Sequence, residues 1–119
     1  MPRFMLLLHD DVNAFSALSP EQMQKVIEKY VNWGDRLRSS GVIRDGQKLT
    51  DEPGRVIRSS GGQVRVTDGP YSETKEVLGG YYTIAADGYE QAIEVARTCP
   101  HLEYGGTIEV RQIDTMGSE

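Results

Sequence analysis

Charged and aromatic side chains gather in one short stretch of the chain, from Thr67 to Ile84, with the sequence TDGPYSETKEVLGGYYTI. A carboxylate in this stretch can act as a base, Lys75 can hold an anionic group, and Tyr71 can stack on a ring or donate a proton. Turn chemistry alone explains the first positions, because Asp68 accepts hydrogen bonds from the following amides and Gly69 reaches positive φ. The stretch is therefore either a substrate loop or a rigid corner whose charges are solvated.

Two histidines lie outside this stretch, His9 at the end of an apolar run and His101 just after Pro100. Each can exchange a proton near neutral pH, although a surface or capping histidine is the simpler interpretation of both. Cys99 is interpreted as a small buried hydrophobic residue. The histidines and scattered carboxylates show no metal-ligand spacing, and the chain has no phosphate-binding or dinucleotide-binding motif, so we predict neither a metal nor a cofactor.

These patterns lead to a definite set of candidate residues for a small-molecule site. We expect the acid–base residues to be His9, Asp68 and Glu73, and the ligand contacts to come from Tyr71, Lys75, Tyr81 and Arg111. Gly79 and Gly80 let another backbone or a ligand approach closely. The simpler interpretation of Arg111 is a partly exposed ion pair with Glu109.

Composition excludes several classes of protein. The chain has 119 residues and a net charge of −5, and its single cysteine cannot form an intrachain disulfide. An acidic chain without a basic cluster is a poor candidate for binding nucleic acid. Its longest apolar run, Phe4 to Leu8, is too short to span a membrane. We therefore expect a cytoplasmic protein with one domain over residues 1–113 and a flexible tail over 114–119.

The elements that must position these residues follow from periodicity. The apolar run at Phe4 to Leu8 predicts a strand. A capping box at Ser19 and Gln22 starts a long amphipathic helix, which includes Tyr30 in its apolar stripe and stops at Gly41. A short edge strand is predicted around Val42 to Leu49 and a hairpin over residues 55–67, followed by a strand after the glycine pair. The second helix is predicted to be capped by Asp87 and Glu90, with a buried stripe formed by Tyr89, Ala92, Ile93 and Ala96. An alternating strand covers residues 106–113. With the hairpin as an insertion, this order is βαββαβ, an α+β ferredoxin-like arrangement.

One face of such a sheet is left open, because both helices pack on the other face. The first strand is apolar on both sides, with Met5 and Leu7 on the side opposite Phe4, Leu6 and Leu8. Apolar surface of this extent is unusual on a monomer. We therefore predict that two copies pack sheet against sheet as a C2 homodimer with a cleft at the interface.

The stretch VTDGPYSETKEVLGGYYTI resembles the signature of the DGPF-domain proteins within the YCII-related family, with Tyr71 in place of the usual phenylalanine. The beginning, RFMLLLHDD, and the end, CPHLEYGGTIEVRQI, also resemble that family, so the likeness covers nearly the whole chain. The resemblance implies a ferredoxin-like fold that dimerises as an α+β barrel in a bacterial protein. Some YCII-related proteins are enzymes that use a His–Asp pair on small aromatic substrates, whereas DGPF members often accompany extracytoplasmic-function sigma factors.

Three functions follow from these observations and stay open at the level of the sequence. The first is an acid–base enzyme for a small, aromatic substrate bound near Asp68 to Glu76. The second is a non-catalytic regulatory module that uses the same loop to contact another protein, with a sigma factor as one such partner. The third is a purely architectural role for the loop.

Overall fold

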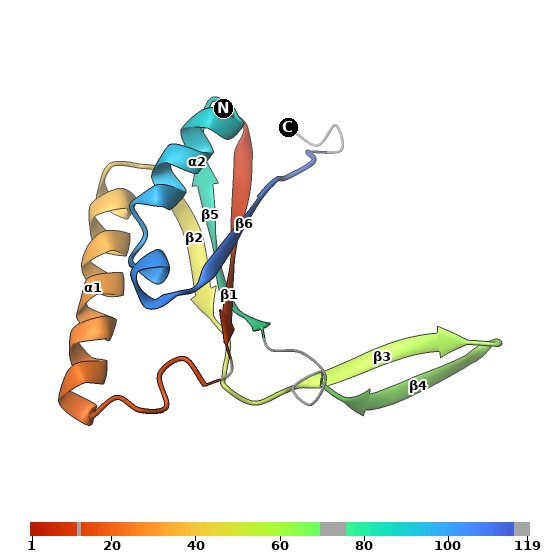
Figure 1. The fold of residues 1–119 in the computed structure, drawn as a ribbon. Helices are drawn as coiled ribbons and strands as arrows, with labels where there is room; N and C mark the ends of the chain where they lie inside the picture. Colours follow the sequence, from red (N-terminus) through yellow and green to blue (C-terminus); the bar gives the residue numbers. More distant parts are fainter. Residues whose placement is uncertain (12, 70–75, 116–119) are drawn as a thin grey trace.

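The computed structural model describes residues 1–11, 13–69 and 76–115. Four antiparallel strands form one sheet in the order β2-β5-β1-β6 (Figure 1). The strands are β1 (Arg3–Asp11), β2 (Ile43–Lys48), β5 (Glu76–Ala85) and β6 (Thr107–Gln112). This strand order, with one helix after β1 and one after β5, confirms the predicted ferredoxin-like α+β fold.

Two α-helices cover the same face of the sheet, as predicted (Figure 1). The first helix, α1 (Pro20–Ser39), starts at the expected capping box: the Ser19 side chain accepts from the Gln22 amide at 3.1 Å, and the Gln22 side chain accepts from the Ser19 amide at 2.8 Å. Such reciprocal bonds satisfy two of the amides that a helix start leaves without partners. Among the described residues, no helix is long and apolar enough to cross a membrane.

The second helix, α2 (Tyr89–Arg97), begins differently from the prediction. Its N-cap is Gly88, and no side chain caps it. The backbone N–H of Asp87 instead donates to the Gln91 side chain at 2.7 Å, so the polar contact runs from the helix back to the loop. A short 3-10 helix, η2 (Pro100–Tyr104), follows α2 and ends at Gly105, whose φ of 80° lies in the left-handed region.

The core lies between the helices and the sheet. Its centre is formed by the inward residues of β1 together with residues from α1, β2, β5 and α2: Phe4, Leu6, Leu8, Trp33, Ile43, Ile84, Ala92 and Ala96. Full burial of one large apolar side chain stabilises a fold by about 1.5–3 kcal/mol, so this cluster is the main support for β1. The predicted alternation of β1 is confirmed, because Met5 and Leu7 are half-buried on the opposite face.

The predicted hairpin is also present, and it stands apart from the body. Strands β3 (Arg55–Ser60) and β4 (Gln63–Asp68) form a two-stranded sheet of their own. Gly61 and Gly62, both with positive φ, make the two-residue turn between them. We call residues 55–68 the arm. It projects from the end of the sheet, on the side away from α1 (Figure 1).

Candidate functional site

Three side chains from distant parts of the sequence meet at the end of β1, on the helix side of the sheet. The ring of His101 is 2% exposed. Its Nδ1 lies 2.9 Å from the Tyr30 hydroxyl, and its Nε2 lies 3.4 Å from Oδ1 of Asp10. The same Nε2 lies 2.9 Å from the main-chain carbonyl oxygen of His9. We call Asp10, His101 and Tyr30 the β1-end cluster.

The hydrogen-bond partners fix the proton on the imidazole. The His9 carbonyl can only accept, so Nε2 of His101 carries the hydrogen. Burial raises the pKa of Tyr30 well above its ordinary value, so the phenol keeps its proton and can donate it to Nδ1. Both ring nitrogens thus have hydrogen-bond partners. The ring is held in one orientation, with an N–H directed at the end of β1.

Asp10 is the member of the cluster that reaches solvent. Its side chain is 27% exposed. Partial burial raises the pKa of its carboxyl, against the opposing attraction of His101 and Lys48. A carboxyl with a raised pKa, next to a fixed N–H and in contact with water, can take up and release a proton at a higher pH than an ordinary aspartate.

Two glycines make room for this arrangement. A side chain at Gly106 would overlap the ring of His101, and one at Gly79 would overlap Oδ2 of Asp10. Gly80, the neighbour of Gly79, lies against β2, where an added Cβ would stand 2.8 Å from the carbonyl oxygen of Gln47. The expected close approach at the glycine pair is therefore present: one glycine faces a carboxylate and the other faces a backbone.

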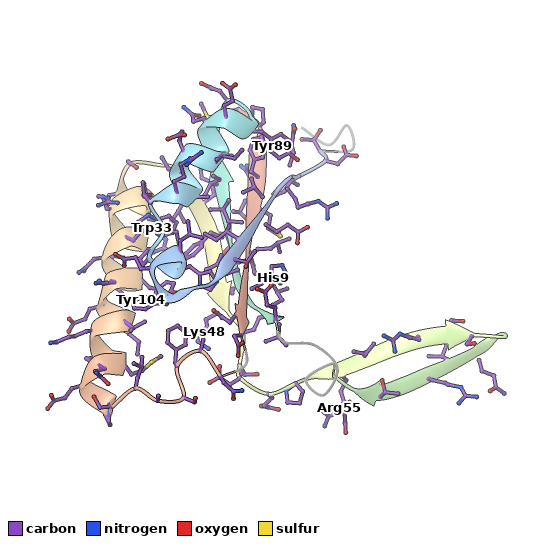
Figure 2. All side chains as sticks on the ribbon, viewed as in Figure 1. His9, Trp33, Lys48, Arg55, Tyr89 and Tyr104 are labelled. Carbon is purple, nitrogen blue, oxygen red and sulfur yellow. The ribbon has the colours of Figure 1, made fainter. Side chains whose placement is uncertain are left out.

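His9 lies on the opposite face of the sheet from His101. The pairing of β1 with β5 shifts its register between Leu8 and His9: Leu8 pairs with Gly80, whereas His9 pairs with Leu78. Nε2 of His9 lies 3.2 Å from Glu109, and Glu109 lies 3.4 Å from Arg111. Figure 2 shows His9 on the side of the sheet away from Trp33. The structure thus brings His9 and Arg111, two of the predicted residues, together through Glu109.

The other predicted residues have different surroundings. Asp68 ends the arm, and its exposed carboxylate lies 3.7 Å from Arg55. The Tyr81 hydroxyl donates to Asp45 at 3.0 Å on the open face. Tyr71, Glu73 and Lys75 lie outside the described residues.

Sequence reasoning missed most of the β1-end cluster. The interpretation of His101 as a surface or capping histidine is wrong, because the folded chain buries its ring between α1 and β1. Tyr30 was one apolar position in a helical stripe, and its hydroxyl gave no separate signal. The nearest signal was local: a histidine followed within five residues by the pair Gly105-Gly106.

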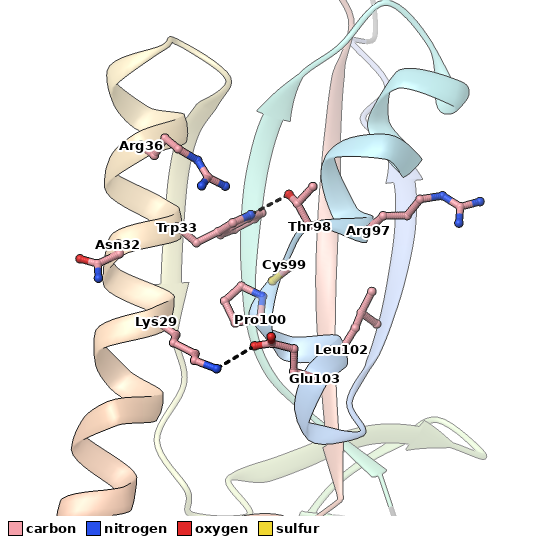
Figure 3. Close-up of a pocket in the computed structure, with 10 residues that line it drawn as sticks. All are labelled: Lys29, Asn32, Trp33, Arg36, Arg97, Thr98, Cys99, Pro100, Leu102 and Glu103. Carbon is pink, nitrogen blue, oxygen red and sulfur yellow. Dashed lines mark hydrogen bonds and ion pairs between the residues drawn. The ribbon is translucent and has the colours of Figure 1, made fainter.

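Away from the β1-end cluster, a pocket of about 370 Å³ lies between α1 and the α2–η2 segment (Figure 3). Trp33 lines it and donates to Thr98 at 2.8 Å, and Lys29 pairs with Glu103 at 3.4 Å. Burial raises the pKa of the Cys99 thiol to about 11, so this residue is no nucleophile at neutral pH. The pocket therefore lacks the reactive pair found at the end of β1.

Comparison with known proteins agrees with the resemblance in the sequence. The model of a family described as the YCII-related domain matches residues 2–116. The chain belongs to the YCII-related family. It is also similar to a protein of Rhizobium meliloti (strain 1021) described as uncharacterized protein R00369, with 28% identity over 112 residues, covering 92% of this chain and 90% of that protein.

The described part of this YCII-related chain contains no group of three or more His, Cys, Asp or Glu side chains placed to hold a metal ion. Its candidate site consists of hydrogen-bonding and ionisable groups alone. What the arrangement offers is proton transfer, with Asp10 as the exposed carboxyl and His101 as the buried group that orients it.

Proposed function

We propose that this YCII-related protein is an acid–base enzyme that moves a proton on a small aromatic substrate, working as a homodimer. The observation that carries the proposal is the β1-end cluster, in which a buried and fully hydrogen-bonded imidazole holds an N–H beside the part-exposed carboxyl of Asp10. Titratable groups with raised pKa values and a fixed partner are typical of catalytic acid–base pairs.

Asp10 is the proton-transferring residue of the proposal, and His101 and Tyr30 are positioning residues. The ring of His101 has a hydrogen on Nε2, which suits it to support the ionised form of Asp10 after proton release. Tyr30 holds the ring by its second nitrogen, so the N–H cannot rotate away from the strand end. We propose that His101 and Asp10 are the His–Asp pair that the resemblance implies.

A separate part of the proposal is an anion-binding surface on the open face, on the side of the sheet opposite Asp10. Arg111 is largely exposed, and its only charged partner in the described chain, Glu109, is shared with His9. Half-buried Met5 and Leu7 lie on the same face and offer an apolar floor for a ring. A second copy packed on this face would enclose the floor, which is the reason for proposing a homodimer with a cleft.

Tyr71, Glu73 and Lys75 are part of the proposal because they directly precede β5 in the sequence. Lys75 directly precedes Glu76, and Glu76 pairs with Asp11 at the start of β5. The segment that contains Tyr71, Glu73 and Lys75 therefore joins the sheet next to Asp10. We propose that these side chains and Asp68 contribute to the rim of the same site.

Proton transfer can be tested without knowing the substrate. We would incubate the protein in D2O with a panel of small aromatic acids and follow solvent deuterium entering C–H positions by NMR. Wild-type protein and the neighbouring control Asp11→Asn should exchange at least one compound, and Asp10→Asn should not. Exchange that is unchanged in Asp10→Asn would contradict the proposal. If wild-type protein exchanged none of the compounds and instead bound a sigma factor or another protein, the regulatory alternative would be favoured.

A further inference from the structure

The arm has two chemically different faces. Cross-strand pairing puts Ile57 opposite Val66, and Val64 opposite Ser59, on one face. These three apolar side chains are 66%, 61% and 70% exposed, for Ile57, Val66 and Val64 in turn. The other face carries Arg58 directly opposite Arg65. Like charges placed opposite each other destabilise a strand pair, and neither arginine forms an ion pair within the described residues.

The arm has too little support to be stable by itself. A two-stranded hairpin is at best marginally stable in water, and a third strand or a packing partner is needed for independent stability. Apart from Val56, every side chain of β3 and β4 is exposed. The sequence nevertheless has the β-branched residues and the two-glycine turn of a well-formed hairpin. Within the described part of the single chain, the apolar and basic faces of the arm therefore have no packing partner.

Charge identifies which surface would attract the arm. The arm holds three arginines and one aspartate, a net charge of +2, so the rest of this chain, whose total is −5, has a net charge of −7. A second copy of the same chain therefore presents an acidic body to a basic arm. Complementary charges of this kind guide association and fix how two surfaces meet.

The position of the arm agrees with that occupant. The arm leaves the sheet from the end that holds Asp10 and projects on the open side (Figure 1). Two sheets packed face to face are about 10 Å apart, and a six-residue strand is about 20 Å long. An arm of this length reaches past the sheet of a second copy seated on the open face.

We propose that the arm of each subunit clasps the body of a second copy of this chain, with Ile57, Val64 and Val66 packed on it and with the charges of Arg58 and Arg65, on the outer face of the arm, attracting the acidic body. This proposal rests on the homodimer of the proposed function and adds an exchanged contact to it. Because the two arms are related by the C2 axis, each subunit both gives and receives one arm.

Hydrogen exchange measured by mass spectrometry tests the clasp directly. The amides of residues 55–68 should exchange at least tenfold more slowly at protein concentrations where sedimentation shows a dimer than at dilutions where it shows a monomer. A dimer whose arm amides exchange as fast as those of the monomer would overturn the clasp and leave the arm for a different protein partner. A monomer at every concentration would overturn both the clasp and the homodimer, and the deuterium-incorporation assay would still report separately on Asp10.

Matched variants locate the contact on one face of the arm. Ile57→Thr combined with Val66→Thr keeps β-branched residues while removing apolar surface, and should raise the dimer dissociation constant at least tenfold. Val56→Thr makes the same kind of change on the opposite face and should leave the constant unchanged.

Arg58→Gln with Arg65→Gln should weaken the salt dependence of dimerisation. If Val56→Thr raised the dimer dissociation constant as much as Ile57→Thr combined with Val66→Thr, the proposed orientation of the arm would be contradicted. Trp33 fluorescence reports whether the body stays folded.

Discussion

The Nε2 nitrogen of His101 donates a hydrogen bond to the main-chain carbonyl oxygen of His9, across a distance of 2.9 Å. The ring of His9 itself is turned to the other face of the sheet, where it contacts Glu109. The two histidines of this chain are therefore joined through the backbone of β1 while facing different surroundings. Any shift of the strand end alters both at once.

Removing the Tyr30 hydroxyl should destabilise the fold. In Tyr30→Phe, the buried Nδ1 of His101 loses its donor, which costs about 1–3 kcal/mol of the free energy of unfolding. Urea unfolding followed by Trp33 fluorescence measures the change. The control is Tyr81→Phe, which removes a hydroxyl that contacts Asp45 at the surface and should leave the urea midpoint almost unchanged. Equal midpoints for Tyr30→Phe and wild-type protein would contradict the assignment of this hydrogen bond.

A methyl group at position 106 should push the imidazole out of place. Gly106→Ala introduces a Cβ where the His101 ring now lies, and forced repacking of this kind costs about 1–3 kcal/mol. Thermal unfolding measures the loss, and any proton-transfer activity should fall with it. Gly88→Ala provides the comparison, because a Cβ at Gly88 meets no atom within 4 Å. A Gly106→Ala protein as stable as the Gly88→Ala protein would show that the ring has room to move.

The opposite result is expected in the middle of α1. Gly34 is buried, but the nearest atom to a Cβ built there is Nη1 of Arg38, at 4.0 Å. Gly34→Ala should therefore raise the free energy of unfolding by about 0.5–1 kcal/mol, because alanine loses less backbone entropy in a helix. Chemical unfolding measures it. Gly41→Ala, at a φ of 81° just after the helix, should lower the stability instead, since alanine is strained there.

The raised pKa of Asp10 predicts a pH dependence of stability. The folded chain holds this proton more tightly than the unfolded chain, so the resulting stabilisation is complete below the ordinary pKa of 3.8 and is lost as the pH rises through the folded value. Wild-type protein should therefore lose stability relative to Asp10→Asn as the pH rises above the ordinary pKa of 3.8. Urea unfolding of both proteins at several pH values gives the difference. If wild-type protein instead gained stability relative to Asp10→Asn as the pH rises, folding would lower the pKa of Asp10 and the prediction would be wrong.

Local patterns were sufficient for most of the fold. The capping box at Ser19 and Gln22, the alternation of β1 and the turn at Gly61-Gly62 are each determined by residues a few positions apart, and each is present in the structure. The start of α2 was mispredicted, because Gln91 reaches back to the Asp87 amide although Asp87 is itself a good capping residue. Tyr89 and Ile93, predicted to be buried on α2, are 46% and 40% exposed.

The candidate site was less predictable for a physical reason. The contacts of His101 join it to Tyr30 and to the His9 carbonyl, separated from it by 71 and 92 positions. Such contacts depend on how α1, η2 and β1 pack together, which no periodicity encodes. His9 and Arg111 were chosen from the sequence as site residues, and Glu109 links them, because all three alternate outward on neighbouring strands. Whether they bind a ligand stays a prediction.

The register shift beside His9 has a consequence for how chains with this fold can diverge. On β1, successive side chains face opposite sides, so a one-residue insertion or deletion near Leu8 would exchange the places of His9 and Asp10 and disconnect both from their partners. The arm has no such constraint, since adding or removing a pair of residues on each strand preserves its pairing. Length variation among relatives should therefore accumulate around Gly61-Gly62 and be absent from the end of β1.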